Sequence, residues 1–402
     1  MRLKEICDYI SRGTTPDYVD ESPYKVMNQA TFSKGRLDED NIRYTSKNIR
    51  EAQIKKGDLL MASTGGGVLG KVFFFDSDDT SFYADSHVSI LRNSKGKNLM
   101  KYLYYVFSIK YDEINATMVK GSTNQTELQR NYLLAYEMDI PSLSKQQRIV
   151  DYLDAELGKI DARIAVLEKE QDAYARLKKS VIHHAVTRGL NPNVSLKDSG
   201  VKWIGLIPEH WELQRFKSIF TECKSVTETG QEDLLSVSEY YGVARRIDKM
   251  EDGEYESRAD SLVGYKVCKK DDLVINIMLA WKRGLGFSDF DGIVSPAYAV
   301  YRGKNIAPHY FHYLMRTDMY VAEYKRNSKG IIDSRLRMYT DRFNNIMAIV
   351  PPLSEQQAIA AYLDEKCSKI DAATENIGKQ IDALERLKRA LINEVVTGQR
   401  AV

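Results

Sequence analysis

The sequence of 402 residues contains only four cysteines, Cys7, Cys223, Cys268 and Cys367, and none of them has the spacing of a metal site. Such scarcity favours a reducing environment over a disulfide-stabilised secreted fold. No stretch approaches the roughly 20 consecutive apolar residues that a membrane helix needs, and the first residues lack the apolar run of a signal peptide. We therefore expect a cytoplasmic protein without a membrane segment.

An excess of charge is also missing, since 58 basic residues face 56 acidic ones and the formal net charge is +2. A protein that coats nucleic acid regardless of sequence usually carries a strong positive charge. Any nucleic-acid interface in this chain must therefore be local. The hydrophobic content of 43% over 402 residues is enough for at least two buried cores, so we expect more than one domain.

Motifs of catalytic chemistry are missing as well. The sequence has no Asn-Pro-Pro-Tyr methyltransferase tetrad and no convincing paired-carboxylate nuclease motif. Gly65–Lys71 matches part of a phosphate-binding loop, but Val72 replaces the hydroxyl residue that binds magnesium, and a strand-like run follows where a helix should begin. The pair His183-His184 is better explained as surface histidines than as a metal site. We predict a non-catalytic chain with no metal and no cofactor of its own.

What the sequence does contain is a long internal repeat. Leu143–Thr187 returns as Leu353–Thr397, 210 positions later, with 21 of 45 positions identical. A repeat of this length indicates a duplicated structural unit. Both copies place apolar residues at alternating intervals of four and three, which is typical of a two-helix coiled coil. The seam positions are Leu153, Leu157, Ile160, Ile164 and Leu167 in the first copy, and Leu363, Ile370, Ile377, Ile381 and Leu384 in the second.

Each copy begins with the signals of a helix N-terminus. We predict Ser144 and Ser354 as the N-caps, with Gln147 and Gln357 three residues later as the partners of a capping box. Roughly 40 residues at about 1.5 Å per residue give a helix near 60 Å long. The face opposite the seam is charged, so neither helix buries much surface except by pairing, and we expect the two copies to pair with each other.

Each helix follows a segment of about 140 residues, which we call a head. The two heads share a plan, with a basic-apolar start, a strand after a double lysine, a second alternating strand, an aromatic helix and a Lys-Gly loop. Their loops differ, since residues 63–67 read Ser-Thr-Gly-Gly-Gly where the second head has Met278–Arg283. Because loops on a common scaffold carry function, we interpret the heads as readers of different targets. Drift of an unimportant surface is the alternative.

The expected fold class is α+β, with two paralogous α/β heads separated by two long helices that form an antiparallel coiled coil with pseudo-two-fold symmetry. The predicted boundaries are an N-terminal head at 1–142, a first helix at 143–187, a turn-rich linker at 188–210, a C-terminal head at 211–352 and a second helix at 353–397.

Loops of both heads contain side chains suited to DNA. Arginine and lysine pair with guanine edges, asparagine and glutamine pair with adenine, and lysine and serine often bind phosphate. The candidates in the first head are Ser63, Thr64, Lys71, His87, Lys120, Ser122, Thr123, Asn124 and Gln125. Those in the second head are Trp281, Lys282, Arg283, Tyr298, Lys325, Lys329, Ser334, Arg335 and Arg337. For any single lysine or arginine, a solvated surface charge is the default alternative.

Three short motifs occur once in each helix, and a fourth occupies the linker. They are Leu-Ser-x-Gln-Gln from Leu143 and Leu353, Tyr-Leu-Asp from Tyr152 and Tyr362, Lys-Ile-Asp from Lys159 and Lys369, and the linker Asp198–Trp211. Together they resemble the conserved regions of the specificity subunits of type I restriction-modification systems. The resemblance spans the whole chain.

The resemblance implies that each head is a target recognition domain that reads one half of a bipartite, asymmetric site in double-stranded DNA. It implies that the coiled coil sets the gap between the halves and docks two modification (methyltransferase) subunits, which carry S-adenosylmethionine. Restriction subunits, ATP-dependent translocases and nucleases, join some such complexes. From the residues alone, a coiled-coil scaffold for proteins and a two-headed DNA-binding regulator remain alternatives. The target bases and the gap length do not follow from the sequence.

Overall fold

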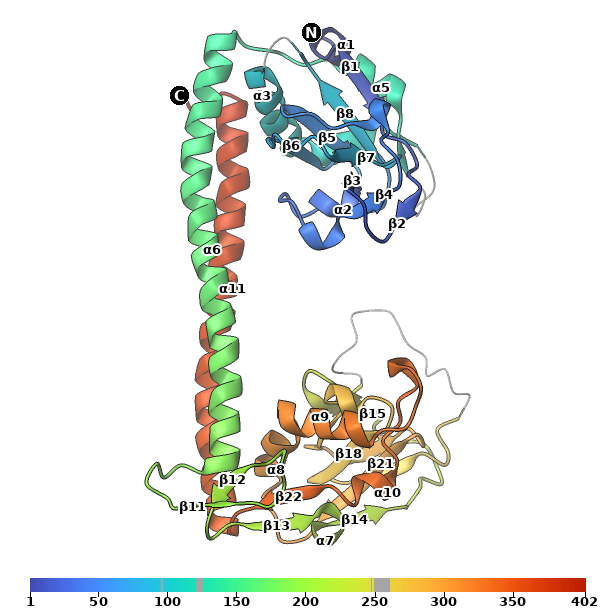
Figure 1. Ribbon diagram of the computed structural model, residues 1–402, viewed down its shortest axis with the longest axis vertical. Coiled ribbons are helices and arrows are strands. Elements are labelled where there is room, and N and C mark those ends of the chain that lie inside the picture. The colour runs from blue at the N-terminus through green and yellow to red at the C-terminus, as the bar shows by residue number, and fades with distance from the viewer. Residues whose placement is uncertain (95–96, 121–125, 247, 249–260) are drawn as a thin grey trace. The chain divides into compact units, whose positions relative to one another are not determined.

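The computed structural model describes residues 1–94, 97–120, 126–246, 248 and 261–402. These residues form two compact units. Unit 1 comprises Met1–Glu168 and Gly378–Val402, and unit 2 comprises Lys169–Ile377. Two long helices, α6 (Leu143–Arg188) and α11 (Leu353–Val396), each contribute one stretch to each unit (Figure 1). Each unit therefore contains one head and a pair of helical stretches.

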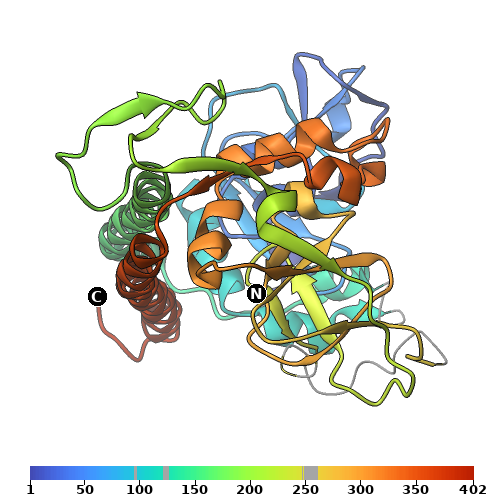
Figure 2. The ribbon, with the colours of Figure 1, turned by 90° about the horizontal axis from the view of Figure 1, so that it is seen from below.

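The helical stretches run antiparallel and side by side within each unit, as both ribbon views show (Figure 2). In unit 1, the Lys388 ammonium lies 2.5 Å from a carboxylate oxygen of Asp161. In unit 2, the Lys178 ammonium lies 2.6 Å from the equivalent oxygen of Asp371. The two lysines and the two aspartates occupy equivalent positions of the repeat, so the same contact is made twice in the same register. The predicted antiparallel coiled coil with an internal two-fold repeat is confirmed.

Most of the predicted seam is hidden from solvent. The buried seam residues are Leu153, Leu157, Ile164, Leu167, Leu363, Ile370 and Ile377, and the half-buried ones are Ile160, Ile381 and Leu384. Leu153 and Leu157 belong to the hydrophobic core of the head in unit 1, and Leu363 belongs to the core of the head in unit 2. Near each head, the seam thus packs against the head as well as against the other helix.

The prediction of Ser144 and Ser354 as N-caps is wrong. The helices begin one residue earlier, at Leu143 and Leu353, so both serines lie inside the first turn. Gln147 does not complete a capping box, because its side chain donates to a carboxylate one turn further along the helix, at 2.7 Å. Gln147 is therefore not the glutamine that fixes the start of α6.

A buried glutamine fixes each helix start instead. The side-chain amide of Gln146 donates to the carbonyl of Pro141 at 2.6 Å, and that of Gln356 donates to the carbonyl of Pro351 at 2.8 Å. The amide oxygen of Gln356 also accepts the backbone N–H of Ala307 at 2.9 Å. A buried amide that is satisfied on both sides holds one geometry. The first glutamine of the Leu-Ser-x-Gln-Gln motif thus ties the helix start to the chain before it and, in unit 2, to the head.

The head of unit 1 contains two four-stranded sheets and one two-stranded sheet, with helices packed against them. Its elements are α1 (Leu3–Ile6), β1 (Tyr9–Arg12), β2 (Tyr18–Val19), β3 (Tyr24–Met27), α2 (Gln29–Phe32), η1 (Glu39–Asn41), β4 (Arg43–Thr45), η2 (Arg50–Ala52), β5 (Asp58–Ala62), β6 (Val72–Phe75), β7 (Phe82–Ala84), β8 (Val88–Arg92), α3 (Lys97–Ser108), α4 (Tyr111–Thr117), β9 (Val119–Lys120), β10 (Glu127–Leu128) and α5 (Arg130–Ala135). One sheet has the order β1-β8-β5-β6 and is antiparallel. The other four-stranded sheet has the order β2-β4-β3-β7, in which only β3 and β7 are parallel. Helix α3 packs against β5 and β6.

The head of unit 2 repeats the first of these sheets. Its elements, with the preceding linker, are β11 (Leu196–Asp198), β12 (Leu206–Pro208), β13 (Glu212–Arg215), α7 (Phe216–Ile219), β14 (Phe220–Cys223), β15 (Leu235–Ser238), β16 (Gly242–Arg245), β17 (Lys266–Cys268), β18 (Asp272–Asn276), η4 (Ala280–Lys282), β19 (Leu285–Phe287), β20 (Gly292–Val294), β21 (Tyr298–Gly303), α8 (Pro308–Met315), α9 (Asp318–Asn327), η5 (Asp333–Arg335), α10 (Thr340–Phe343) and β22 (Met347–Val350). The sheet order β14-β21-β18-β19 corresponds to β1-β8-β5-β6. The remaining strands pair as β11-β12, β13-β22, β15-β16 and β17-β20.

A bidentate ion pair with a buried aspartate occupies the same place in both heads. Arg92 on β8 donates twice to Asp58 on β5, with both distances 2.6 Å. Arg302 on β21 donates twice to Asp272 on β18, at 2.9 and 3.0 Å. Both aspartates are 1% exposed. Two sheets with the same strand order need not contain a bidentate Arg–Asp pair at equivalent positions. Its presence in both heads confirms that they are paralogous copies of one α/β fold.

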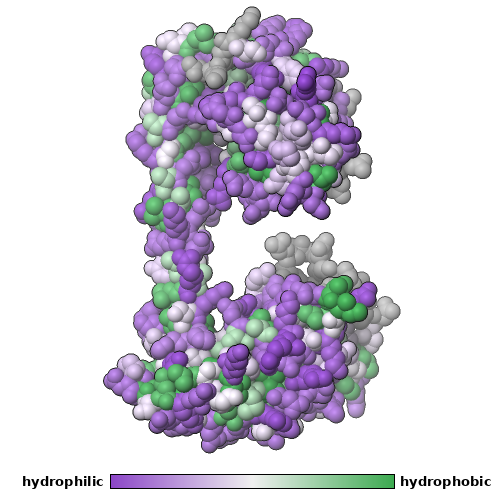
Figure 3. All heavy atoms as spheres, viewed as in Figure 1, coloured by the Kyte–Doolittle hydropathy of each residue, from purple (hydrophilic) through white to green (hydrophobic). Residues whose placement is uncertain are grey.

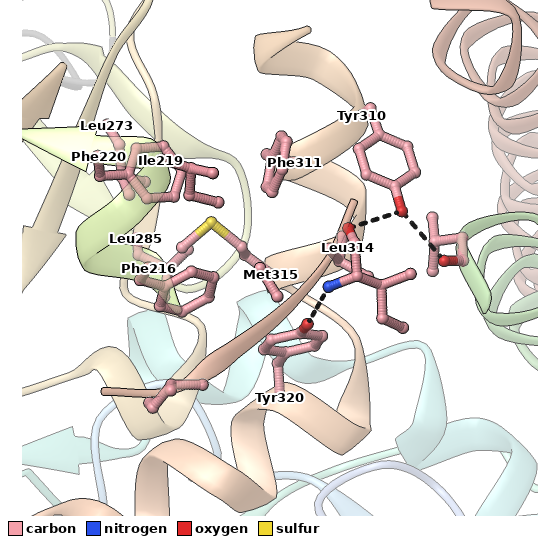
Figure 4. Close-up of a cluster of buried hydrophobic side chains, with 14 of the residues drawn as sticks. Phe216, Ile219, Phe220, Leu273, Leu285, Tyr310, Phe311, Leu314, Met315 and Tyr320 are labelled. Carbon is pink, nitrogen blue, oxygen red and sulfur yellow. Dashed lines mark hydrogen bonds between the residues drawn. The ribbon is translucent and has the colours of Figure 1, made fainter. Parts of the chain in front are cut away.

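Aromatic side chains join the head of unit 2 to the helices. The Tyr310 hydroxyl on α8 lies 3.2 Å from the carbonyl of Val186 on α6 and 3.3 Å from the carbonyl of Ile349 on β22. The Tyr320 hydroxyl on α9 accepts the N–H of Ile349 at 3.3 Å (Figure 4). Trp211, the first residue of the C-terminal head, is fully buried and donates its indole N–H to a carboxylate on α11. The head is thus fixed to both helices by buried aromatic groups with satisfied polar atoms.

The surface in the view of Figure 3 is largely hydrophilic over both heads, with hydrophobic atoms interspersed along the helices. Over the described ranges, we find no helix with the length and apolarity needed to span a membrane.

Candidate nucleic-acid interface

Several of the predicted residues of unit 2 gather around Trp281. This tryptophan lies in η4, directly after β18, and its indole N–H donates to the carbonyl of Met278 at 3.0 Å. The ammonium groups of Lys282 and Lys325 lie 5.1 and 5.2 Å from the centre of a Trp281 ring. These distances are within the range of cation–π contacts. Both lysines are exposed, so the cluster presents two positive charges to solvent beside an oriented ring.

A second cationic segment follows α9. The backbones of Lys329 and Arg337 pair through two hydrogen bonds of 2.9 Å, which closes a hairpin over residues 329–337 that we call the basic hairpin. Its cationic residues are Lys329, Arg335 and Arg337. Lys325 of the Trp281 cluster forms an ion pair with Asp333 of the hairpin, at 2.9 Å. The two cationic elements are therefore adjacent.

Other predicted residues of unit 2 have contacts within the head. Arg283 has a left-handed backbone with φ +61°, donates to the carbonyl of Arg316 at 3.1 Å and forms an ion pair with Asp318. Tyr298 is half-buried, and its carbonyl accepts the ammonium of Lys266 at 2.5 Å. These contacts favour structural roles for Arg283 and Tyr298. A DNA contact by either of them stays a prediction, as it does for Ser334, whose side chain is not described.

In unit 1, the predicted residues lie around the turn between β5 and β6. Ser63 is buried, and its hydroxyl lies 2.6 Å from that of Ser89. The hydroxyl of Thr64 lies 2.7 Å from a ring nitrogen of His87, which is exposed. The ammonium of Lys71 donates to the carbonyl of Ser33 at 2.9 Å. Of these residues, His87, which lies directly before β8, is exposed, and Thr64 and Lys71 are half-buried.

The remaining predicted residues of the first head are Lys120 and residues 122–125. Lys120 ends β9, and its side chain is not described. Ser122, Thr123, Asn124 and Gln125 lie outside the described residues. Their contact with DNA stays a prediction.

The glycine-rich turn of unit 1 does not have the architecture of a phosphate-binding loop. It is followed by strand β6, whereas such a loop needs a helix whose N-terminus faces the phosphate. Gly70 has φ +86°, and a Cβ atom there would lie 2.9 Å from the side chain of Ile114, so this glycine is required for packing. Among the described residues, no group of three or more His, Cys, Asp or Glu side chains is placed to hold a metal ion.

The structure also reveals exposed residues that the sequence did not single out. Tyr240 is 84% exposed and Ile331 is 99% exposed. The turn that carries Tyr240 is held by Arg316, which donates to the carbonyls of Glu239 and Tyr240 at 2.8 and 3.1 Å. Burial, and the neighbouring charge of Arg283, lower the pKa of Arg316 to about 10. No periodicity in the sequence marks either exposed residue, because an isolated apolar or aromatic residue is usually part of a core.

A cavity of about 670 Å³ lies between α6 and the head of unit 2. Its lining includes Lys179, Arg283, His312 and Asp318. Asp318 forms an ion pair with Arg283, and its other oxygen lies 3.8 Å from the ammonium of Lys179. The lining holds four cations, Lys178, Lys179, Arg283 and Arg316, against two carboxylates, Glu239 and Asp318. Because Lys178, Arg283 and Arg316 are engaged in contacts within unit 2, the exposed basic hairpin is the better candidate for binding a phosphate backbone.

Comparison with known proteins places this geometry in context. Residues 1–169 match the family described as the type I restriction modification DNA specificity domain. A curated relative, the type I restriction enzyme MjaVIII specificity subunit of Methanocaldococcus jannaschii, is 22% identical over 369 residues, which are 87% of this chain and 80% of the relative. A solved chain from work on complex assembly and conformational transition of the type I R-M system has the same fold, with a TM-score of 0.66 at 14% identity over 98% of this chain and 96% of that one.

The matched family covers the first head and the start of α6. The second head repeats the same sheet and the same bidentate ion pair, and α11 repeats α6 in sequence and in helix pairing. The curated relative extends over both halves. Residues 1–169 thus match the type I restriction modification DNA specificity domain, and the chain over most of its length is similar to a type I restriction enzyme specificity subunit.

Proposed function

We propose that this chain is the DNA-recognition subunit of a type I restriction-modification complex, and that each head reads one half of a bipartite site. One observation carries the proposal. The same head scaffold occurs twice on a repeated helix, whereas the exposed loops differ, with a glycine-rich turn in unit 1 and a basic hairpin in unit 2. Equal scaffolds with unequal loops suit two unequal half-sites, so we expect the site to be asymmetric.

We infer different tasks for the cations of unit 2. Lys282, Lys325 and Lys329 are exposed ammonium groups, which bind phosphate as point charges and set the register on the duplex. Arg335 and Arg337 have the planar group that pairs bidentately with guanine, so they are the candidates for base reading. In unit 1, Thr64 and His87 are the described candidates.

The proposed partners are double-stranded DNA, two modification subunits and, in some complexes, restriction subunits. Methyl transfer would take place on the modification subunits with S-adenosylmethionine, and ATP would be used by restriction subunits, so this chain itself needs no cofactor. The charged faces of α6 and α11 opposite the seam offer a long surface for docking. We propose that the helical pair sets the distance between the half-sites.

Mapping of DNA methylation tests this function. The chain is expressed with its modification partner in a host without other methyltransferases, and N6-methyladenine is located across the genome. We expect a split motif with a constant unspecified gap, which disappears when the chain is omitted and the partner is expressed alone. A motif that persists without the chain, or the absence of any motif beside an intact complex, would favour the scaffold function over DNA recognition.

A further inference from the structure

The tip of the basic hairpin is apolar. Ile331 is 99% exposed and its neighbour Ile332 is 53% exposed. Single exposed apolar residues are common on soluble proteins and need no explanation. Two adjacent isoleucines at the end of a projecting, cationic hairpin are a different case, because nearly all of the Ile331 side chain and about half of Ile332 face water. In Figure 1 the hairpin projects from the body of unit 2 beside α9.

The hairpin is held in place at its base. The backbone pair between Lys329 and Arg337 closes it, and the N–H of Met338 donates to the carbonyl of Ile277, next to the end of β18, at 2.8 Å. Gly330 has φ +157°, and a Cβ atom there would lie 2.6 Å from the carbonyl oxygen of Arg335, so only glycine fits. The ion pair between Lys325 and Asp333 adds a link to α9. A segment built in this way presents its tip in a fixed position.

Charge distinguishes between the possible partners of the tip. The single carboxylate of the hairpin, that of Asp333, is paired with Lys325. The hairpin also carries Lys329, Arg335 and Arg337, of which Lys329 and Arg335 are exposed and Arg337 is half-buried. An apolar tip surrounded by cations matches a partner with anionic edges and an apolar interior. Duplex DNA has this arrangement, because phosphates flank the groove and the base stack offers aromatic faces and thymine methyl groups.

We propose that Ile331, supported by Ile332, is an apolar base contact of the second head, which packs against the base stack while the cations of the hairpin bind the flanking phosphates. Isoleucine has no group that bonds to phosphate, so its favourable contact in DNA is with bases, as in proteins that insert an apolar wedge at a base step. This inference rests on the proposed function and adds a specificity-determining residue to it.

Binding measurements on the full chain, in complex with its modification subunits, test the inference. The probes are a duplex with the mapped site and a duplex of scrambled sequence, each titrated at several salt concentrations. We expect Ile331→Ala to weaken binding of the specific duplex roughly tenfold, since one isoleucine side chain loses its burial. Binding of the scrambled duplex and the salt dependence should stay unchanged. Because the side chain is fully exposed, the substitution is not expected to disturb folding.

Two control variants separate an apolar contact from an ionic one. Lys329→Ala should weaken both duplexes and reduce the slope of log affinity against log salt by about one. Leu206→Ala, which removes an apolar side chain that is 44% exposed on β12, should change neither. If Ile331→Ala binds the specific duplex within twofold of the wild type, or weakens both duplexes equally, the inference is wrong.

The remaining outcomes point to other causes. Loss of the modification subunits from purified Ile331→Ala would show that the tip binds protein and would overturn the inference. If the wild-type complex itself fails to prefer the mapped duplex, the proposed function fails before the variant is compared. Retention of affinity by Ile331→Leu, together with its loss in Ile331→Asp, is expected for an apolar contact.

Discussion

His312 on α8 is a single residue through which pH acts on unit 2. It is half-buried and lies close to the backbone of β16, because a Cβ atom at Gly242 would lie 3.0 Å from its Cε1. Burial, with the nearby charges of Arg316 and His309, lowers its pKa to about 3, while Asp364 acts in the opposite direction. The folded state therefore holds this histidine neutral in conditions where the unfolded chain would protonate it.

We expect acid to destabilise unit 2 through this residue. A pKa that is lowered on folding gives stability that is complete above the unfolded value of about 6.5 and declines as pH falls toward the folded value. From pH 7 to pH 5, the loss due to His312 is about 2 kcal/mol. The measurement is urea unfolding followed by tryptophan fluorescence, which reports unit 2 alone, since Trp203, Trp211 and Trp281 all lie in it.

His312→Gln provides the control, because glutamine does not titrate in this range. The free energy of unfolding of the variant should depend less steeply on pH than that of the wild type. Between pH 7 and pH 5, the wild type should lose about 2 kcal/mol more stability than the variant. Equal pH dependence of both proteins would show that His312 does not contribute.

At the scale of elements, the turn before the central strand of each head can be compared between the two copies. Gly57 precedes β5 with φ +89°, and Asp271 precedes β18 with φ +66°. The N–H of Gly57 donates to the carbonyl of Phe75 on β6 at 2.8 Å. The N–H of Asp271 donates to the carbonyl of Ser288, directly after β19, at the same distance. The same left-handed position is thus filled by glycine in one head and by an L-residue with a strained backbone in the other.

Replacement of Asp271 by glycine should stabilise unit 2 by about 0.5 to 1 kcal/mol, because relief of the left-handed strain outweighs the added freedom of the unfolded chain. Urea unfolding followed by tryptophan fluorescence measures the change. Asp289→Gly is the matched control, since Asp289 is also exposed but is not among the residues with positive φ, and it should give no gain. A loss of stability in Asp271→Gly would contradict the argument.

The elements show which parts of the structure could be predicted from the sequence. The long helices and their pairing followed from periodicity over many turns, because every seam residue adds to the same signal. The capping residues were wrong, since the bond that fixes each helix start runs from Gln146 or Gln356 back to a proline. The Leu-Ser-x-Gln-Gln motif gives the same sequence signal for this bond as for a capping box. A pattern repeated over many residues therefore predicted the long helices, whereas a single hydrogen bond left no distinct signal in the sequence.

The candidate interface was less predictable for a similar reason. Ser63 was predicted at the surface, but a hydrogen bond to Ser89 on the neighbouring strand β8 holds it in the interior. The exposure of Ile331 has no signal in the sequence, because an isoleucine usually belongs to a hydrophobic core. Only the closed hairpin shows that its side chain is exposed. Both cases depend on pairing between segments that are distant or irregular in sequence.

At the scale of the whole molecule, the repeated contact in the helical pair bears on the proposed spacing role. The pairs Lys178–Asp371 and Lys388–Asp161 give the antiparallel register in unit 2 and in unit 1. These ion pairs are partly exposed and contribute little stability, so the apolar seam determines the pairing. Any insertion that keeps whole heptads in both helices therefore preserves the seam while it lengthens the pair.

Three added heptads in each helix should lengthen the gap in the methylated site. Twenty-one residues at about 1.5 Å each add roughly 31 Å, close to one DNA turn of about 34 Å, so both heads can still face the same side of the duplex. We expect an unchanged pair of half-sites separated by about nine additional base pairs, read by methylation mapping. The insertions are placed between Glu168 and Lys169 and between Ile377 and Gly378, where the helices pass from one unit to the other.

One added heptad in each helix is the informative control. It lengthens the pair by about 10 Å, or roughly three base pairs, which would turn the second half-site by about a third of a DNA turn away from its head. Methylation should then be strongly reduced although the coiled coil is intact by circular dichroism. If three heptads leave the gap unchanged, or if one heptad is tolerated as well as three, the spacing is set by something other than the helical pair, and the repeated helices serve to hold partner subunits.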